Sequence, residues 1–414
     1  MKVAVIDHIG NYGGGSRVVR ALLPAIKALR PEMEITYFGN PASIKRENVT
    51  AEFMQIGISV VPLDSLRLSS HGFFNIGISI QIIKYLQMLF WRNLRHIPYV
   101  LSGEVHKELE KKLKGFDLAF FPWPYLISVP NLRCPLVGIF HDFNFKYYFS
   151  GELTYYQPQL ERLNKEIPEW LQRATPIVST KFMANELTKF YPEFIGKARV
   201  AHIASMSTMS IIGEQETREI VCSLGVTRPY ILYPTNMCAH KNVGPLISAL
   251  PILRQMGHDV QLILTGPGTE QVHGRACSIG VELVNDVQEV LGLGYVTNVQ
   301  MDSLIQCAAV VVSSSLYEAG NGPGLDAWMR GIPVAMSNIP AFIEHLEVQN
   351  VRAGVFDPRS PQDIADKIHN ILVNPEKAAS DALHSREALC KLTWEQTAVR
   401  YLEIFDEVLK RRQA

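Results

Sequence analysis

The sequence of 414 residues lacks an excess of either charge, because 40 lysines and arginines balance 40 aspartates and glutamates. Nucleic-acid-binding domains are usually strongly basic, so this balance argues against a nucleic-acid partner. Low-complexity segments are missing as well. The hydrophobic fraction of 47% and the charged fraction of 19% are ordinary for a soluble globular protein.

The sequence also has few cysteines, and no two of them form a C-x-x-C pair. This spacing argues against a structural zinc site and against a framework of disulfides. No signal peptide precedes the first apolar run, "VAVID" at 3–7. We therefore expect reduced thiols, no metal site and a cytoplasmic location. The six cysteines are Cys134, Cys222, Cys238, Cys277, Cys307 and Cys390.

Long apolar runs are rare, and residues 73–91 form the one that approaches the length of a membrane span. This run contains four polar side chains, Asn75, Gln81, Lys84 and Gln87. Such side chains are costly at the centre of a bilayer, so a buried or amphipathic helix is favoured. The alternative is peripheral contact of residues 73–96 with the inner membrane face. In that case the residues facing anionic lipid are Lys84, Arg92 and Arg95.

Short runs rich in Val, Ile and Phe alternate with helical spacing along most of the chain. This alternation predicts parallel sheets covered by helices on both faces. The predicted strands are 3–7, 34–38, 58–62, 118–121, 136–140, 176–179, 199–203, 230–234, 260–266, 309–314, 333–337 and 354–358.

The chain is too long for a single hydrophobic core, so we expect two domains. A polar segment without a clear strand begins near Ser205 and is interpreted as the linker. The predicted boundaries are an N-terminal domain at 1–205, a linker at 206–228, a C-terminal domain at 229–390 and a final amphipathic helix at 391–414. Ligands of such domains bind where the strand-to-helix loops gather at the carboxyl ends of the strands.

Three strand-to-helix loops carry residues suited to a phosphate or a polar hydroxyl. Gly13, Gly14 and Gly15 follow the first strand, where free backbone N–H groups approach a ligand closely. His141 follows the strand at 136–140 directly and is expected to point into the cleft. Lys241 precedes a helix that starts near residue 242 and is placed to neutralise a phosphate. The alternatives are a plain tight turn, a structural histidine and a solvated lysine.

The fourth loop is "SSSLYEAGNGPGLDAWMRGIPV" at 313–334, which joins a strand to a helix. Pro323 is a favourable first helical residue, and the positive helix N-terminus near Gly322 and Pro323 suits a diphosphate. Glu318 lies on the loop and Asp326 in the expected first turn, and each carboxylate can bind a vicinal diol. A hydrolytic pair or two helix-capping acids are alternative interpretations.

Taken together, these loops resemble those of retaining GT-B-fold glycosyltransferases of the family 4 (group 1) type. That family's hallmark is a glutamate, seven residues and a second glutamate, which stands here as "YEAGNGPGLDAWMRGIPV". The glycine turn at 13–14, the "HD" at 141–142 and the "KN" at 241–242 occur in the family's order. The resemblance covers nearly the whole chain and implies an α/β, GT-B fold of two doubly wound Rossmann-like domains facing a cleft.

The resemblance implies a role for each matching residue. Lys241 and the helix N-terminus would neutralise the donor diphosphate, and Asp326 would hold the donor ribose. Glu318 and His141 would contact the transferred sugar near the reacting centre. Backbone at 295–296 would hold the base. The implied catalytic residues are His141 and Glu318. The implied donor-binding residues are Gly13, Gly14, Gly15, Asn236, Lys241, Tyr295, Val296, Glu318, Gly322, Pro323 and Asp326.

Two departures from the family pattern concern the donor site. The second acid is Asp326, one methylene shorter than the usual glutamate, and it still accepts a diol. Many relatives have an arginine five or six positions before the lysine, where this chain has Thr235 or Asn236. The diphosphate site therefore has one positive charge fewer, which leaves more of the neutralisation to Lys241 and the helix dipole.

The resemblance implies a retaining, metal-independent hexosyltransferase with a nucleotide-sugar donor, UDP-glucose first and GDP-mannose next. No D-x-D motif lies between strands, and no cofactor other than the donor is expected. The expected acceptor is a saccharide or lipid-linked saccharide of bacterial polysaccharide biosynthesis. A UDP-sugar epimerase of the same fold and a degenerate, partner-type transferase are the alternatives. A nicotinamide dehydrogenase would need the G-x-G-x-x-G pattern, which the loops lack.

Overall fold

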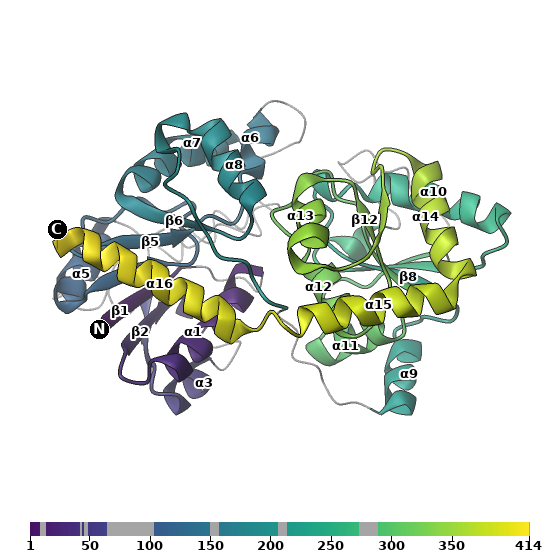
Figure 1. Cartoon of the computed structure of the whole chain (residues 1–414), viewed down its shortest axis with the longest axis horizontal. Coiled ribbons are helices and arrows are strands. Elements are labelled where there is room, and N and C mark those ends of the chain that lie inside the picture. The colour runs from purple at the N-terminus through teal and green to yellow at the C-terminus, as the bar shows by residue number, and fades with distance from the viewer. Residues whose placement is uncertain are drawn as a thin grey trace, which may run out of the picture.

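The computed structural model describes residues 1–8, 14–41, 44, 49–63, 103–149, 157–205, 213–272 and 289–413. Each half of the chain forms one parallel β-sheet with helices on its faces, and the two halves form separate lobes (Figure 1). This is the predicted α/β architecture of two doubly wound domains. The predicted membrane-contact segment at 73–96 lies outside the described residues.

The N-terminal sheet has seven strands in the order β3-β2-β1-β4-β5-β6-β7. The strands are β1 (Lys2–Asp7), β2 (Glu34–Gly39), β3 (Ser59–Pro62), β4 (Leu118–Phe121), β5 (Leu136–Ile139), β6 (Ala174–Val178) and β7 (Arg199–Val200). β1 lies at the centre, where Val5 pairs with Tyr37 of β2 and with Phe120 of β4. The strand order reverses direction between β1 and β4, which opens a crevice at their carboxyl ends.

The C-terminal sheet has six strands in the order β10-β9-β8-β11-β12-β13. They are β8 (Tyr230–Pro234), β9 (Gln261–Thr265), β10 (Val290–Gly292), β11 (Val310–Ser313), β12 (Val334–Ser337) and β13 (Gly354–Phe356). The corresponding reversal lies between β8 and β11. The sequence analysis missed β10, because a run of three residues is too short to be recognised locally and only the pairing with β9 identifies it as a strand.

Helices connect the strands and cover both sheets. In the N-terminal domain they are α1 (Gly14–Leu29), α3 (Val49–Gln55), α5 (Gly103–Lys112), α6 (Asn144–Phe149), α7 (Gln157–Arg173) and α8 (Lys181–Phe190), with the 3₁₀ helices η2 (Leu113–Gly115) and η3 (Pro192–Phe194). The helices of the second half are α9 (Glu214–Ser223), α10 (Val243–Gln255), α11 (Asn298–Gln306), α12 (Gly322–Met329), α13 (Pro340–Gln349), α14 (Pro361–Val373), α15 (Pro375–Leu389) and α16 (Trp394–Gln413), with η4 (Ala239–Lys241) and η5 (Thr269–Gln271).

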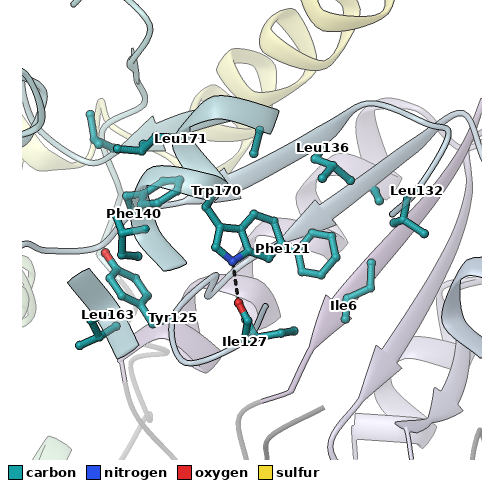
Figure 2. Close-up of a cluster of buried hydrophobic side chains, with 14 of the residues drawn as sticks. Ile6, Phe121, Tyr125, Ile127, Leu132, Leu136, Phe140, Leu163, Trp170 and Leu171 are labelled. Carbon is teal, nitrogen blue, oxygen red and sulfur yellow. Dashed lines mark hydrogen bonds between the residues drawn. The ribbon is translucent and has the colours of Figure 1, made fainter. Parts of the chain in front are cut away.

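One face of the N-terminal sheet is covered by an aromatic cluster beneath α7 (Figure 2). Trp170 is fully buried, packs on Phe121 with ring centroids 4.8 Å apart, and donates its indole N–H to the carbonyl of Ile127 at 2.7 Å. A buried indole that also satisfies its N–H combines a large apolar area with a fixed orientation. The loop after β4 is thereby held against the core at Ile127.

The last helix, α16, leaves the C-terminal domain and packs along α1 of the N-terminal domain (Figure 1). Tyr401 and Phe405 are buried in the N-terminal core and contact Phe120 of β4. Part of the segment expected to be a linker forms α9, which packs on α11 with Val221 and Val226 in the C-terminal core. A polar composition indicated a linker there because only those few apolar residues face the core.

Two further findings concern the helices and cysteines that the structure describes. Across these ranges, no helix combines the length and apolar character needed to cross a bilayer. Among the described cysteines, Cys222, Cys238, Cys307 and Cys390 are free thiols.

Candidate active site

The carboxyl ends of the two sheets face one another, and side chains bridge the domains there. Arg17 of α1 lies 3.4 Å from Asp326 of α12. The Glu344 carboxylate of α13 accepts the backbone N–H groups of Lys181 and Phe182 at the start of α8, at 2.7 and 2.8 Å. These residues lie in helices that follow strands, so the two domains are in contact at the carboxyl ends of their sheets.

Lys241 and Glu318 meet at the crevice between β8 and β11. The lysine Nζ lies 2.5 Å from Glu318 Oε1, which also accepts the Ser315 hydroxyl at 2.7 Å. Burial alone would lower the pKa of Lys241, but the charge and hydrogen bond of Glu318 outweigh burial and leave that pKa raised. Lys241 is therefore positively charged. It forms an ion pair with Glu318, a second predicted site residue, 77 positions further along the chain.

The position of Lys241 is fixed by the residues around it. Asn242 has the left-handed backbone with φ of 52°, which ends η4 and begins α10. Its amide donates to the carbonyls of Ser314 at 3.0 Å and Pro358 at 2.7 Å, so it joins the ends of β11 and β13. Tyr233 of β8 donates to the Lys241 carbonyl at 3.0 Å. Asparagine tolerates this backbone conformation better than most residues, which explains the "KN" sequence.

Helix α12 begins differently from the prediction. It starts at Gly322, so Pro323 is its second residue and Asp326 lies beyond the first turn. Asn321 is the cap, and its side-chain oxygen Oδ1 accepts the N–H of Gly324 at 3.0 Å and the Ser313 hydroxyl at 2.9 Å. Because Pro323 has no N–H and that of Gly324 is used, the first turn offers an anion fewer N–H groups than expected.

Asp326 faces the N-terminal domain. It is buried, accepts the Ser205 hydroxyl at 3.0 Å and lies beside Arg17. Burial raises the pKa of Asp326, and the neighbouring Arg17 only partly opposes this. Glu318 and Asp326 thus have separate cationic partners, and neither caps α12. The interpretation of both as helix-capping acids is wrong, because Asn321 takes that role.

His141 and Asp142 lie opposite, at the end of β5. The ring of His141 packs on Trp123 with centroids 4.7 Å apart, and its Nε2 donates to the carbonyl of Pro122 at 2.7 Å. Burial lowers the pKa of His141 to about 4, so the ring is neutral at pH 7 and Nδ1 is an acceptor. With Nε2 bound to the Pro122 carbonyl, only Nδ1 of His141 is left to bind a ligand, as an acceptor.

Asp142 is the second residue of the "HD" pair, and its pKa responds to the charges of Glu318 and Lys241. Burial raises the pKa of its carboxyl to about 6, the nearby Glu318 adds to this, and Lys241 opposes it. Asp142 is thus electrostatically coupled to Glu318 and Lys241 of the other domain. The resemblance already groups Lys241 with Glu318, whereas it gives Asp142, which lies in the other domain, no role of its own.

The predicted base-binding loop lies at the carboxyl edge of the second sheet. Tyr295 is 64% exposed and follows Gly294, whose carbonyl accepts the N–H of Gly266 at 2.6 Å. Gly266 has φ of 121°, and a Cβ there would lie 1.9 Å from the carbonyl oxygen of Thr235. This contact brings Tyr295 and Val296 to the same edge as Asn236, whose side chain accepts the N–H of Cys238 at 3.0 Å.

The remaining predicted residues are the glycines after β1. Gly14 and Gly15 are the first two residues of α1, and Gly13 lies outside the described residues. The sequence analysis gave no role to Arg17, Ser205, Ser315 or Tyr317, although Ser315 and Tyr317 lie in the quoted loop at 313–334. Within the part of the chain that the structure describes, no three His, Cys, Asp or Glu side chains gather as a metal-binding cluster.

Residues 228–374 match the model of the family described as glycosyl transferases group 1. Alpha-D-kanosaminyltransferase of Streptomyces kanamyceticus is 24% identical over 298 residues, which cover 70% of this chain and 73% of that protein.

Solved structures share the two-domain fold at low sequence identity. HepE of Anabaena, solved in complex with UDP-glucose, superposes with a TM-score of 0.68 at 16% identity, covering 98% of this chain and 100% of that one. Sucrose-phosphate synthase of Thermosynechococcus elongatus superposes with a TM-score of 0.63 at 16% identity, covering 99% and 100%. Residues 228–374 are thus similar to the group 1 glycosyl transferases, and the chain as a whole has the GT-B fold.

Proposed function

We propose that this protein is a retaining, metal-independent hexosyltransferase that uses a nucleotide-diphosphate sugar. The observation that carries the proposal is the pairing of Lys241 with Glu318 at the crevice between β8 and β11. A cation and a carboxylate at one point suit a donor in which a diphosphate joins a sugar ring. Both groups are electrostatically coupled to Asp142, which follows His141 in the other domain, and an acceptor would approach from that side.

In the proposed reaction the protein positions its substrates and neutralises the leaving group. The diphosphate oxygens would replace Glu318 as partners of Lys241, and the dipole of α12 would add to the neutralisation. Glu318 would then accept hydroxyls of the transferred sugar, while Nδ1 of His141 accepts another. Attack from the face that the diphosphate leaves retains the anomeric configuration, with the departing phosphate taking the acceptor proton.

The ribose of the donor is assigned to Asp326 and the base to the backbone of Tyr295 and Val296. Asp326 is already bonded to Arg17 and Ser205, so ribose binding would rearrange this interdomain contact. The exposed ring of Tyr295 offers a surface beside the base.

UDP-glucose is the proposed donor and GDP-mannose the second candidate. HepE, which shares the fold, was solved with UDP-glucose, and this supports testing a UDP-hexose first. The proposed acceptor is a saccharide or a lipid-linked saccharide of bacterial polysaccharide biosynthesis. The basic and apolar stretch at 73–96 supports an acceptor near the inner membrane face.

The test compares two substitutions in the paired residues. Lys241→Met removes the charge and keeps much of the side-chain volume, and UDP affinity measured by calorimetry should fall about 10- to 100-fold. Glu318→Gln should leave UDP affinity within about threefold, while turnover of UDP-glucose falls about 100-fold or more. The matched control is Lys367→Met on α14, a partly exposed lysine of the same domain paired with Asp363 at 3.6 Å.

Product analysis separates the alternatives. A transferase releases UDP and passes the hexose to an acceptor or to water, whereas an epimerase returns an altered UDP-sugar. Full UDP affinity in Lys241→Met would remove the diphosphate assignment. A chain that binds UDP without turning over any donor would point to the degenerate, partner-type protein, although this chain keeps both paired residues.

A further inference from the structure

The residues on both sides of Glu318 are bound by the opposite domain. Tyr317 precedes Glu318, and its hydroxyl accepts the backbone N–H of Phe143 in the N-terminal domain at 3.1 Å. Ala319 follows Glu318, and its carbonyl accepts the hydroxyls of Ser179 at 3.4 Å and Thr180 at 3.3 Å. The loop that carries Glu318 therefore belongs to one domain by sequence and is fastened to the other by hydrogen bonds.

Tyr317 is the stronger of these attachments. It is 7% exposed, and its ring lies between Tyr147 of α6 and Phe182 of α8, at centroid distances of 4.8 and 6.1 Å. Its hydroxyl also reaches the sulfur of Met183 at 3.6 Å. Burial raises the pKa of Tyr317, so the hydroxyl stays protonated and keeps both contacts. The side chain is thus a buried anchor of the C-terminal domain in a pocket of the N-terminal domain.

The partner of Tyr317 occupies a matching position in its own loop. Phe143 comes directly after Asp142 and two residues after His141, so the Tyr317–Phe143 hydrogen bond joins residues next to both halves of the predicted sugar site. The Asp142 backbone is held on its other side by Tyr125, whose hydroxyl donates to the Asp142 carbonyl at 2.7 Å and accepts its N–H at 3.1 Å. The Tyr317 hydroxyl therefore links the residue before Glu318 directly to the His141 loop.

We infer that Tyr317 is a positioning residue, which fixes Glu318 against the His141–Asp142 loop when the two domains are in contact, with Thr180 as its second support. This inference rests on the proposed transferase function. Lys241 is held within the C-terminal domain by Tyr233 and Asn242, so nucleotide binding does not depend on the anchor. Sugar transfer does depend on it, because Glu318 and His141 come from different domains.

The first experiment compares Tyr317→Phe with Tyr230→Phe. Each change removes one buried hydroxyl, and that of Tyr230 bonds to the carbonyl of Leu304 at 2.6 Å inside the C-terminal domain, away from Glu318. With UDP-glucose as probe, turnover of Tyr317→Phe should fall about tenfold with KM within about threefold, as for one lost buried hydrogen bond. UDP affinity should stay at the wild-type value in both variants, and turnover should stay there in Tyr230→Phe.

A second comparison uses Thr180, whose hydroxyl also caps α8 by accepting the N–H of Met183 at 3.2 Å. Thr180→Ser keeps the hydroxyl and should retain turnover, whereas Thr180→Val should lose it with UDP affinity intact. These variants test the inference even if Tyr317→Phe fails to fold.

The outcomes separate the inference from the proposed function. A wild-type protein that binds no UDP and turns over no donor contradicts the transferase proposal itself. If the wild type is active, the positioning role alone is contradicted by two results together. These are equal turnover of Tyr317→Phe and Tyr230→Phe, and equal turnover of Thr180→Val and Thr180→Ser. Loss of UDP affinity in Tyr317→Phe would show a general structural role and would overturn the inference as well.

Discussion

At the scale of single residues, the carboxyl edge of the N-terminal sheet contains ionisable groups that burial keeps neutral. His8 at the end of β1 is 1% exposed, donates from Nε2 to the carbonyl of Tyr125 at 3.0 Å, and has no partner for Nδ1 among the described residues. Burial lowers its pKa to about 4, as it does for His141 and His240. A buried imidazole of this kind is harder to protonate in the folded chain than in the unfolded chain, so the stability of the fold depends on pH.

The prediction for His8 concerns the pH dependence of unfolding. The unfolded chain protonates this histidine near pH 6.5, while the native chain does so only near pH 4, so native stability falls as pH drops through this window. Between pH 7 and 5.5 the unfolding free energy of the wild type should fall by about 1 kcal/mol more than that of the His8→Gln variant. Urea denaturation at several pH values measures this difference, and parallel curves for the two proteins would contradict it.

At the scale of elements, the start of α12 depends on Asn321. This side chain is 1% exposed, caps the helix through Gly324 and accepts the hydroxyl of Ser313 at the end of β11. The backbone N–H of Asn321 donates to Nε2 of the buried His345 at 2.9 Å. The cap therefore joins the strand before the loop, the helix after it and α13 behind it.

Replacement of this cap tests how much the loop depends on it. Asn321→Ala should cost about 2–3 kcal/mol of unfolding free energy, because two buried donors lose their acceptor. Ser360→Ala at the less buried start of α14 removes a similar cap, in which the hydroxyl accepts the N–H of Asp363, and should cost about 1 kcal/mol. Chemical denaturation compares the two, and equal losses would show that Asn321 acts as an ordinary cap.

Most elements could be predicted from the sequence, because β-branched runs and helical spacing are strong local signals. The start of α12 could not be predicted to the residue: Pro323 marked it, but the cap proved to be Asn321, one position before Gly322. β10 was missed since its identity depends on pairing with β9. The acids and Lys241 were found from their motifs, whereas Arg17, Ser205 and Tyr317 act through contacts between domains that no local pattern encodes.

At the scale of the whole molecule, α16 ties the two domains together. Tyr401 is fully buried in the N-terminal core, with Phe120 and Phe405 against its ring. On the rim of the helix, Asp406 binds both terminal nitrogens of Arg30 at 3.0 and 2.5 Å. An apolar centre with charged groups at its rim suits a helix that a partner domain covers.

Two substitutions on α16 test this packing. Tyr401→Ala should cost about 3 kcal/mol or more, since a buried ring is replaced by a cavity. Val399→Ala on the same helix, where the valine is 45% exposed, should stay within about 0.5 kcal/mol of the wild type. Thermal unfolding should show the lower midpoint in the transition that includes the N-terminal domain, and similar midpoints for both variants would contradict the docking role.

The most direct test of the account is a calorimetric titration of the wild-type protein with UDP, GDP, ADP and dTDP, each with and without EDTA. The account predicts saturable binding at one site, strongest for UDP, unchanged by EDTA and weakened in Lys241→Met. Binding that disappears with EDTA would contradict the metal-independent site. Absence of binding for all four nucleotides would contradict the central claim that Lys241 and Glu318 form a nucleotide-sugar site.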